Sequence, residues 1–275
     1  MAQRKIKMVA LDLDGTLLSS DKTLGALSKE ILTRLYKKGI HITLSTGRAF
    51  HHTHHVAALL GFPVHIVCVD GAYILPLGYK EPILKPFPTG LIREILELLK
   101  DDLPYVYLFT KDQIWCRNCQ EVNEQIYGWG SQLFSSELNF TADLQILQIV
   151  YINTAAEADA LHQLLRKEMP SLPAELSLSL EPGYHQITIR PPGVNKGTGL
   201  ETLAGLLGHK LEETVVFGDW LNDLPMLEKA GLAVTPANSV AEVKAAADII
   251  SAYTSDEDFV GRELERLLAE KRIIA

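Results

Sequence analysis

Residues 7–17 read KMVALDLDGTL, a short apolar run that ends abruptly in two aspartates. A continuous Val- and Leu-rich run of this length is typical of a strand buried on both faces. Asp12 and Asp14 stand two apart on an extended chain end, so their side chains point the same way. Close carboxylates need a cation between them, or one must hold a proton. Gly15 permits a sharp departure from the strand, and Thr16 can cap the next turn of the chain.

Strands and helices alternate after this run. A helix containing Leu27, Ile31 and Leu35 ends at Gly39, and strands at 40–44 and 64–69 flank a second helix at 49–60. Val-, Ile- and Leu-rich strands separated by helices predict a parallel sheet covered on both faces. We therefore expect an α/β protein with a Rossmann-like core.

The rhythm changes near residue 72 and returns near residue 193. Residues 73–88 suggest a hairpin that leaves the sheet, and a second α+β unit comes after it. From 193 the expected helices are 196–207, 223–229, 240–246 and 256–269, and the expected strands are 215–217, 232–235 and 248–250. A core of residues 1–82 and 190–275 is thus predicted to carry an inserted α+β domain, residues 83–189, about the size of one small domain.

The composition excludes several classes of protein. The chain has 275 residues, a formal net charge of −8 and three cysteines. An acidic chain is a poor partner for nucleic acid, and few cysteines favour a reducing compartment. The start of the chain lacks the pattern of a signal peptide, and no apolar run approaches the ~18 residues of a membrane span. We expect a globular, cytoplasmic protein.

Three further strand or loop ends carry polar residues. Ser45-Thr46-Gly47-Arg48 (45–48) combines hydroxyls, a glycine amide and a helix start, which together form an anion cradle; an ordinary N-cap explains Thr46 alone. Lys196, in Asn195-Lys196-Gly197, stands at the start of an expected helix. The helix dipole favours acidic residues at this end, so a lysine here suggests an anion nearby. A solvated surface lysine is the alternative.

The last of these ends is Gly218-Asp219-Trp220-Leu221-Asn222-Asp223 (218–223). Mg²⁺ prefers a few carboxylate oxygens plus water and substrate phosphate, and Asp12, Asp14 and Asp219 can supply the carboxylates. A helix N-cap explains only one of the three polar residues. Because reactive groups gather beyond the carboxyl ends of parallel strands, the four segments predict one site.

Taken together, the four segments resemble the motifs of the haloacid dehalogenase superfamily of aspartate-nucleophile phosphatases, and most closely its Cof-type branch. The resemblance covers nearly the whole chain. It implies that the insert is a cap domain between the second and third motifs, which closes over the site and selects the leaving group. Supporting similarity lies in Asp70-Gly71-Ala72, at Asn238 and in residues 254–258.

The resemblance also implies roles for the motif residues. Asp12 would attack phosphorus to form an aspartyl-phosphate, and Asp14 would be the acid and base. The residues implied to hold the substrate phosphate are Thr46, Gly47, Arg48, Lys196 and Asn222. The implied Mg²⁺ ligands are Asp12, Asp14 through its backbone carbonyl, Asp219 and Asp223. Asp223 has an alternative role, which is to orient Lys196 from behind.

The chain departs from the family pattern at a few places. Asp70 stands where the family more often has Asn, Pro236-Ala237 replaces a Met-Gly pair, and Trp220 replaces a small or polar residue. The histidine run at 51–55 and the pair Cys116 and Cys119 suggest metal or redox chemistry, but a solvated helix face and incidental cysteines explain them better.

The prediction is a Mg²⁺-dependent phosphatase that hydrolyses a small phosphorylated metabolite, in particular a sugar phosphate. A phosphosugar mutase of the same superfamily and a non-catalytic metabolite-binding regulator are the alternatives. We expect a monomer or small homo-oligomer with no nucleic-acid or membrane partner.

Overall fold

The computed structural model describes residues 4–100, 105–116, 134–135, 145–179 and 182–274. The chain divides into two compact units. The first unit joins Met1–Ile83 to Asn195–Ala275, and the second is Leu84–Val194. The sequence analysis expected the inserted domain at residues 83–189, so the second unit of the structure begins one residue later and ends five residues later.

An eight-stranded sheet forms the centre of the first unit, in the order β15-β14-β13-β2-β3-β4-β5-β6. The strands are β2 (Met8–Leu11), β3 (His41–Ser45), β4 (His65–Cys68), β5 (Tyr73–Leu75), β6 (Ile83–Leu84), β13 (Thr214–Phe217), β14 (Leu232–Thr235) and β15 (Ile249–Ile250). From β15 to β4 all neighbours are parallel, and β5 pairs antiparallel with β4. A further short parallel pair joins β1 (Arg4–Lys5) to β16 (Ile273–Ile274).

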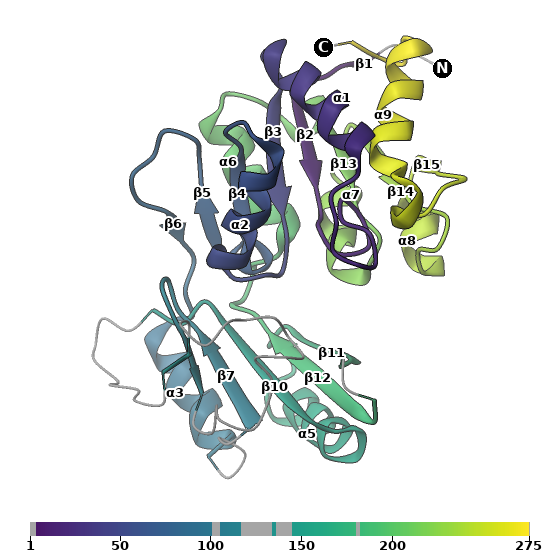
Figure 1. Ribbon diagram of the computed structural model, residues 1–275. Coiled ribbons are helices and arrows are strands. Elements are labelled where there is room, and N and C mark those ends of the chain that lie inside the picture. Colours follow the sequence, from purple (N-terminus) through teal and green to yellow (C-terminus); the bar gives the residue numbers. More distant parts are fainter. Residues whose placement is uncertain (1–3, 101–104, 117–133, 136–144, 180–181, 275) are drawn as a thin grey trace. The chain divides into compact units, whose positions relative to one another are not determined.

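Helices cover both faces of this sheet (Figure 1). They are α1 (Ala26–Lys37), α2 (Phe50–Leu60) and α9 (Phe259–Ala269) on one face, and α6 (Lys196–Leu206), α7 (Leu224–Leu227) and α8 (Ala241–Ala246) on the other. The predicted α/β architecture, a largely parallel sheet between two helix layers, is confirmed.

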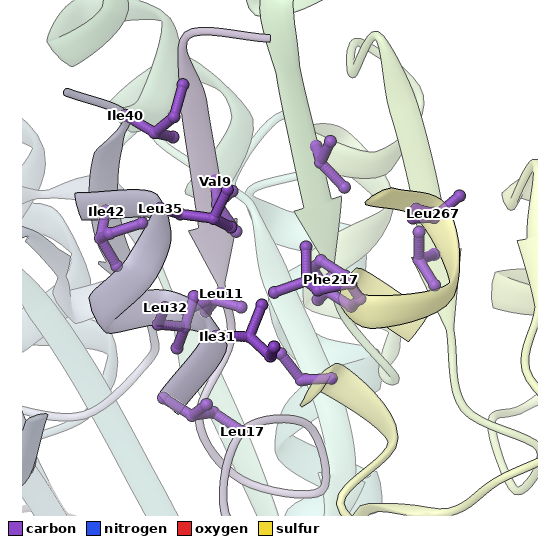
Figure 2. Close-up of a cluster of buried hydrophobic side chains, with 14 of the residues drawn as sticks. Val9, Leu11, Leu17, Ile31, Leu32, Leu35, Ile40, Ile42, Phe217 and Leu267 are labelled. Carbon is purple, nitrogen blue, oxygen red and sulfur yellow. The ribbon is translucent and has the colours of Figure 1, made fainter. Parts of the chain in front are cut away.

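Strand β2 explains why the sheet has two cores. Val9 and Leu11 pack into the cluster with α1, α2 and α9, whereas Met8 and Ala10 pack with α6, α7 and α8. Successive side chains of a strand point to opposite faces, so a strand between two helix layers must be apolar throughout. Figure 2 shows the first cluster, in which Leu35 of α1 lies beside Val9.

The second unit contains a six-stranded sheet in the order β11-β12-β10-β7-β8-β9. Its strands are β7 (Val106–Phe109), β8 (Ile114–Cys116), β9 (Phe134–Ser135), β10 (Gln148–Thr154), β11 (Ala174–Leu178) and β12 (Tyr184–Ile189). Helices α3 (Thr89–Leu98) and α5 (Ala155–Glu168) pack on it through a shared apolar cluster (Figure 1). This unit is α+β, as predicted.

Two local predictions were wrong. The hairpin expected to leave the core sheet stays in it, because β5 pairs with β4 and β6 extends the same edge. The last helix begins at Phe259 instead of residue 256, because Asp258 takes a left-handed conformation with φ 59°. Among the described residues, no helix is both long enough and apolar enough to cross a membrane.

Candidate active site

Three polar segments meet at the carboxyl edge of the first unit's sheet. Asp12 comes directly after β2, Thr46 comes directly after β3, and Asp219 lies two residues after β13. These three strands are parallel neighbours, so their carboxyl ends lie side by side. Open parallel sheets bind ligands in this place.

Lys196 lies between two carboxylates at this edge. Its Nζ donates to Asp12 Oδ1 at 2.7 Å and to Asp223 Oδ1 at 2.6 Å. The lysine is only 1% exposed and Asp12 is 5% exposed. Asn195 positions the lysine by capping α6, because its side chain accepts the Thr198 amide in a reciprocal capping box. The anions that a lysine at a helix start suggested are thus these two aspartates.

Asp219 completes a group of three carboxylates. One oxygen each of Asp12, Asp219 and Asp223 lie within 4.8 Å of one another, and no other such group of acids, histidines or cysteines occurs among the described residues. Thr16 donates its hydroxyl to Asp219 Oδ1 at 2.6 Å. Gly15 has φ 82°, and a Cβ there would lie 2.5 Å from Asp219 Oδ2, so this approach requires glycine.

Three carboxylates and one ammonium leave this group with excess negative charge, which a further cation or a bound proton must compensate. Burial raises the pKa of Asp12 well above its usual value, although Lys196 opposes the shift. Burial and the neighbouring Asp223 raise the pKa of Asp219 to about 6. Burial alone would lower the pKa of Lys196, but Asp12 and Asp223 outweigh it and raise that pKa. Three carboxylates around one ammonium therefore fit a hard divalent cation with oxygen ligands, such as Mg²⁺.

Asp14 has different partners from Asp12. Arg48 donates to it through Nε at 2.6 Å and Nη2 at 2.5 Å, and Lys22 Nζ donates at 2.7 Å. Burial would raise the pKa of Asp14, but the hydrogen bonds and charges of Arg48 and Lys22 lower it to about 2. The resemblance implied that Arg48 binds the substrate phosphate; here its guanidinium binds Asp14.

The loop after β3 and the loop after β13 are joined through Asp70. Thr46 Oγ1 accepts the Arg48 amide at 3.2 Å, so Thr46 closes a local turn and does not cap α2, which begins at Phe50. Asn222 Nδ2 donates to Asp70 Oδ1 at 3.0 Å. Thr46 and Asp70 are buried, whereas Asn222 is partly exposed.

Three residues acquire contacts in the site that sequence reasoning did not assign. Lys22 pairs with Asp14, Thr16 holds Asp219 instead of capping the next turn, and Asp70 accepts from Asn222. The sequence did single out Asp70, because the family more often has Asn at this position. Lys22 carried none, because a surface lysine in a polar turn is common.

The histidine run and the cysteine pair, which suggested metal or redox chemistry, lie on other segments of the chain. His51, His54 and His55 are exposed on α2, and among the described residues they are not part of any cluster of three or more potential metal ligands. Cys116 is buried in β8 of the second unit. Cys119 lies outside the described residues.

Fold and site together define a class: an α/β protein with a carboxylate cluster around one buried lysine at the carboxyl edge of a parallel sheet. Within that class, the family model of haloacid dehalogenase-like hydrolases matches residues 9–264, and the chain belongs to this family. The recognition made from the sequence motifs is confirmed.

Curated relatives and a solved structure extend this finding. The chain is 28% identical to the pyridoxal phosphate phosphatase YbhA of Escherichia coli (strain K12), over 89% of this chain and 92% of the relative. It is 24% identical to the 5-amino-6-(5-phospho-D-ribitylamino)uracil phosphatase YcsE of Bacillus subtilis (strain 168), over 94% of each. A haloacid dehalogenase-like hydrolase from Bacteroides thetaiotaomicron has a TM-score of 0.81 and 26% identity, over 96% of this chain and all of that one. These relatives agree with the predicted enzyme class, a phosphoric monoester hydrolase.

Proposed function

We propose that the chain is a Mg²⁺-dependent phosphatase that hydrolyses a small phosphorylated metabolite through an aspartyl-phosphate on Asp12. One observation carries the proposal. The buried Asp12 carboxylate accepts from the Lys196 ammonium at 2.7 Å, inside the acid group with Asp219. A carboxylate held beside a fixed cation is oriented as a nucleophile toward an anionic phosphoryl group.

In the first step, a carboxylate oxygen of Asp12 forms a bond to phosphorus and the bond from phosphorus to the leaving oxygen breaks. Lys196 is proposed to orient the Asp12 carboxylate through its Nζ, and its positive charge would attract the phosphoryl group. Thr46, the Gly47 amide and Asn222 surround the same edge and are proposed to bind phosphoryl oxygens.

Asp14 is proposed to move the protons. Arg48 and Lys22 keep it ionised, which prepares it to take the proton of the water that cleaves the aspartyl-phosphate and releases inorganic phosphate. For the first step it has to carry a proton to the leaving oxygen. For this, the ion pairs of Asp14 with Arg48 and Lys22 have to break. A phosphate dianion that binds Arg48 would compete with Asp14 for the guanidinium and so favour this break.

Asp12 and Asp219 are the carboxylates proposed to hold the metal. Asp223 is better suited to hold Lys196, because its Oδ1 accepts from that lysine while its Oδ2 accepts the backbone amides of Asp219 and Trp220 at 2.9 and 3.0 Å. A Mg²⁺ ion held by Asp12 and Asp219 would supply positive charge to offset the negative charge of the transferring phosphoryl group. The alternative role of Asp223, orienting the lysine, is the one we favour.

The substrate is proposed to be a small phosphate monoester. The two curated relatives are named for two different phosphorylated metabolites, pyridoxal phosphate and 5-amino-6-(5-phospho-D-ribitylamino)uracil. A sugar phosphate fits this range. We also propose that residues 83–189 serve as a cap domain, and that the protein is a cytoplasmic monomer or small homo-oligomer with no nucleic-acid or membrane partner.

The test is hydrolysis of p-nitrophenyl phosphate with and without MgCl₂, and then ranking of a panel of phosphorylated metabolites by kcat/KM. We expect turnover that requires Mg²⁺, is lost with a chelator and returns on adding Mg²⁺. Equal turnover in the chelated protein would overturn the metal dependence. The absence of phosphate release from every compound would overturn the proposed activity.

A further inference from the structure

The connection between β4 and β5 has an unusual backbone. Val69, Asp70 and Gly71 take three consecutive positive φ angles, of 51°, 49° and 94°. For a β-branched valine this conformation is rare and costly, and it persists only where the surroundings impose it. Strained backbone of this kind concentrates at functional sites, so its contacts are informative.

The backbone of this turn holds the second motif loop. The Asp70 amide donates to Thr46 O at 3.1 Å, and the Val69 amide donates to Arg48 O at 3.0 Å. Two hydrogen bonds from adjacent residues thus fix both ends of the 46–48 segment. The left-handed conformation is what aims both amides at this segment.

The same turn packs against the start of α6. A Cβ on Gly71 would lie 2.2 Å from the Asn195 carbonyl oxygen, so the two backbones are in direct contact. Asn195 is the N-cap of the helix whose first residue is Lys196. The turn therefore sets the position of the third motif as well as the second.

The Asp70 carboxylate connects the fourth motif. Asp70 is 3% exposed, and its Oδ1 accepts from Asn222 Nδ2 at 3.0 Å. The same oxygen lies 3.2 Å from where a Gly47 Cβ would stand. One buried acid thus lies against the loops that carry Gly47 and Asn222, two groups proposed to hold the phosphoryl oxygens.

We propose that Asp70 is a positioning residue for phosphate binding: its carboxylate orients the Asn222 amide, and its strained turn fixes the 46–48 loop against the start of α6. The inference rests on the proposed function, since it deepens the account of the same site. Asp70 acts through Asn222 and does not itself bind the substrate.

The test uses Asp70→Gly, Asp70→Asn, Asn222→Ala and the double variant Asp70→Gly/Asn222→Ala. Glycine adopts φ 49° freely, so Asp70→Gly removes the carboxylate without adding backbone strain. Asparagine keeps an oxygen that can accept the Asn222 bond. The control is Asp248→Asn, an exposed acid of the same unit that accepts the Ala233 amide.

Each variant is measured for the Kd of inorganic phosphate by calorimetry in MgCl₂, for kcat and KM with p-nitrophenyl phosphate, and for Tm. We expect Asp70→Gly to raise Kd and KM by about 10-fold with little change in Tm, and Asp70→Asn to restore both to within about threefold. The double variant should bind phosphate no more weakly than Asn222→Ala alone, because the two residues act as one unit.

Fully additive losses in the double variant, or an Asp70→Gly protein that binds phosphate like the wild type, would overturn the inference. The proposed function fails separately. A wild-type protein that hydrolyses nothing refutes that function, and the phosphate titrations then decide the role of Asp70 without any turnover.

Discussion

Lys196 is the residue on which the charge balance of the site depends. It is an ammonium buried between two aspartates, at 2.7 Å from Asp12 and 2.6 Å from Asp223. Removing one partner of a buried ion pair leaves uncompensated charge, which costs far more than losing a surface pair. The lysine is therefore expected to stabilise the fold in addition to its proposed part in phosphate binding.

Lys196→Met is expected to lower the free energy of unfolding by about 3–5 kcal/mol, because two buried carboxylates lose their counter-charge. Phosphatase activity should fall with it. Urea unfolding at neutral pH measures the first effect, and Lys229→Met is the matched control, since the Lys229–Glu201 pair at 2.8 Å is solvent-exposed. Similar losses in both variants would contradict the account.

A separate prediction concerns His65, which lies at the start of β4 and thus at the end of the sheet opposite the candidate site. Its Nδ1 accepts the Leu77 amide at 3.0 Å, and its Nε2 faces His41 Nδ1 at 3.0 Å. Since Nδ1 accepts, Nε2 must carry the proton and donate to His41. Burial, with His41 and His209 nearby, lowers the pKa of His65 to about 4.

This histidine should make stability fall in acid. Its pKa is lower in the folded than in the unfolded chain, so the unfolded chain binds the extra proton, and the stability present above about pH 6.5 is lost as pH falls toward 4. From pH 7.5 to 5 the expected contribution is about 2 kcal/mol. Urea unfolding of the wild type and of His65→Gln at both values measures it. An unchanged pH dependence in His65→Gln would refute this assignment.

At the scale of elements, α1 is capped by a residue far away in the chain. Gly25 at its N-cap provides no side-chain bond. Asp258 provides the cap instead, since its carboxylate accepts the Leu27 amide at 2.9 Å, the Ser28 amide at 3.2 Å and the Ser28 hydroxyl. The left-handed backbone of Asp258, just before α9, makes this approach possible.

Asp258→Ala is expected to lower the free energy of unfolding by about 1–2 kcal/mol, because two amides at the start of α1 lose their acceptor. Glu265→Ala, on the exposed side of α9, is the control and should change stability by less than about 0.5 kcal/mol. Equal effects of the two substitutions in denaturant melts would argue against the cap.

The elements were predictable from the sequence to the extent that apolar spacing determines them. The helix containing Ile31 and Leu35, and the strand at 7–11, were predictable from periodicity, because burial enforces that pattern. The early start predicted for the last helix was wrong, because a distant helix recruits Asp258. Partner choice of side chains, such as Arg48 with Asp14, depends on three-dimensional contacts that spacing does not encode.

At the scale of the whole molecule, the net charge of the chain disfavours the anionic substrate that the site is proposed to bind. The chain carries a formal charge of −8, yet the proposed substrate is an anion. Part of that excess acid is the group of Asp12, Asp219 and Asp223, which a cation would neutralise locally. Recognition then depends on the charge of the centre and not on that of the surface.

Binding of Mg²⁺ should therefore stabilise the folded protein. MgCl₂ is expected to raise the Tm of the wild type as its concentration passes the Kd, because only the folded chain brings Asp12 and Asp219 together. NaCl at matched ionic strength controls for screening. Asp219→Asn should reduce the shift; a shift of the same size in that variant would exclude Asp219 as a ligand.

The central claim is that Asp12 is the nucleophile, and the hydrolysis of p-nitrophenyl phosphate by Asp12→Asn tests it most directly. The amide is a far weaker nucleophile of nearly the same shape, so kcat/KM should fall by at least about 1,000-fold, provided that circular dichroism shows an intact fold. An Asp12→Asn protein that hydrolyses the ester at the wild-type rate would contradict the account.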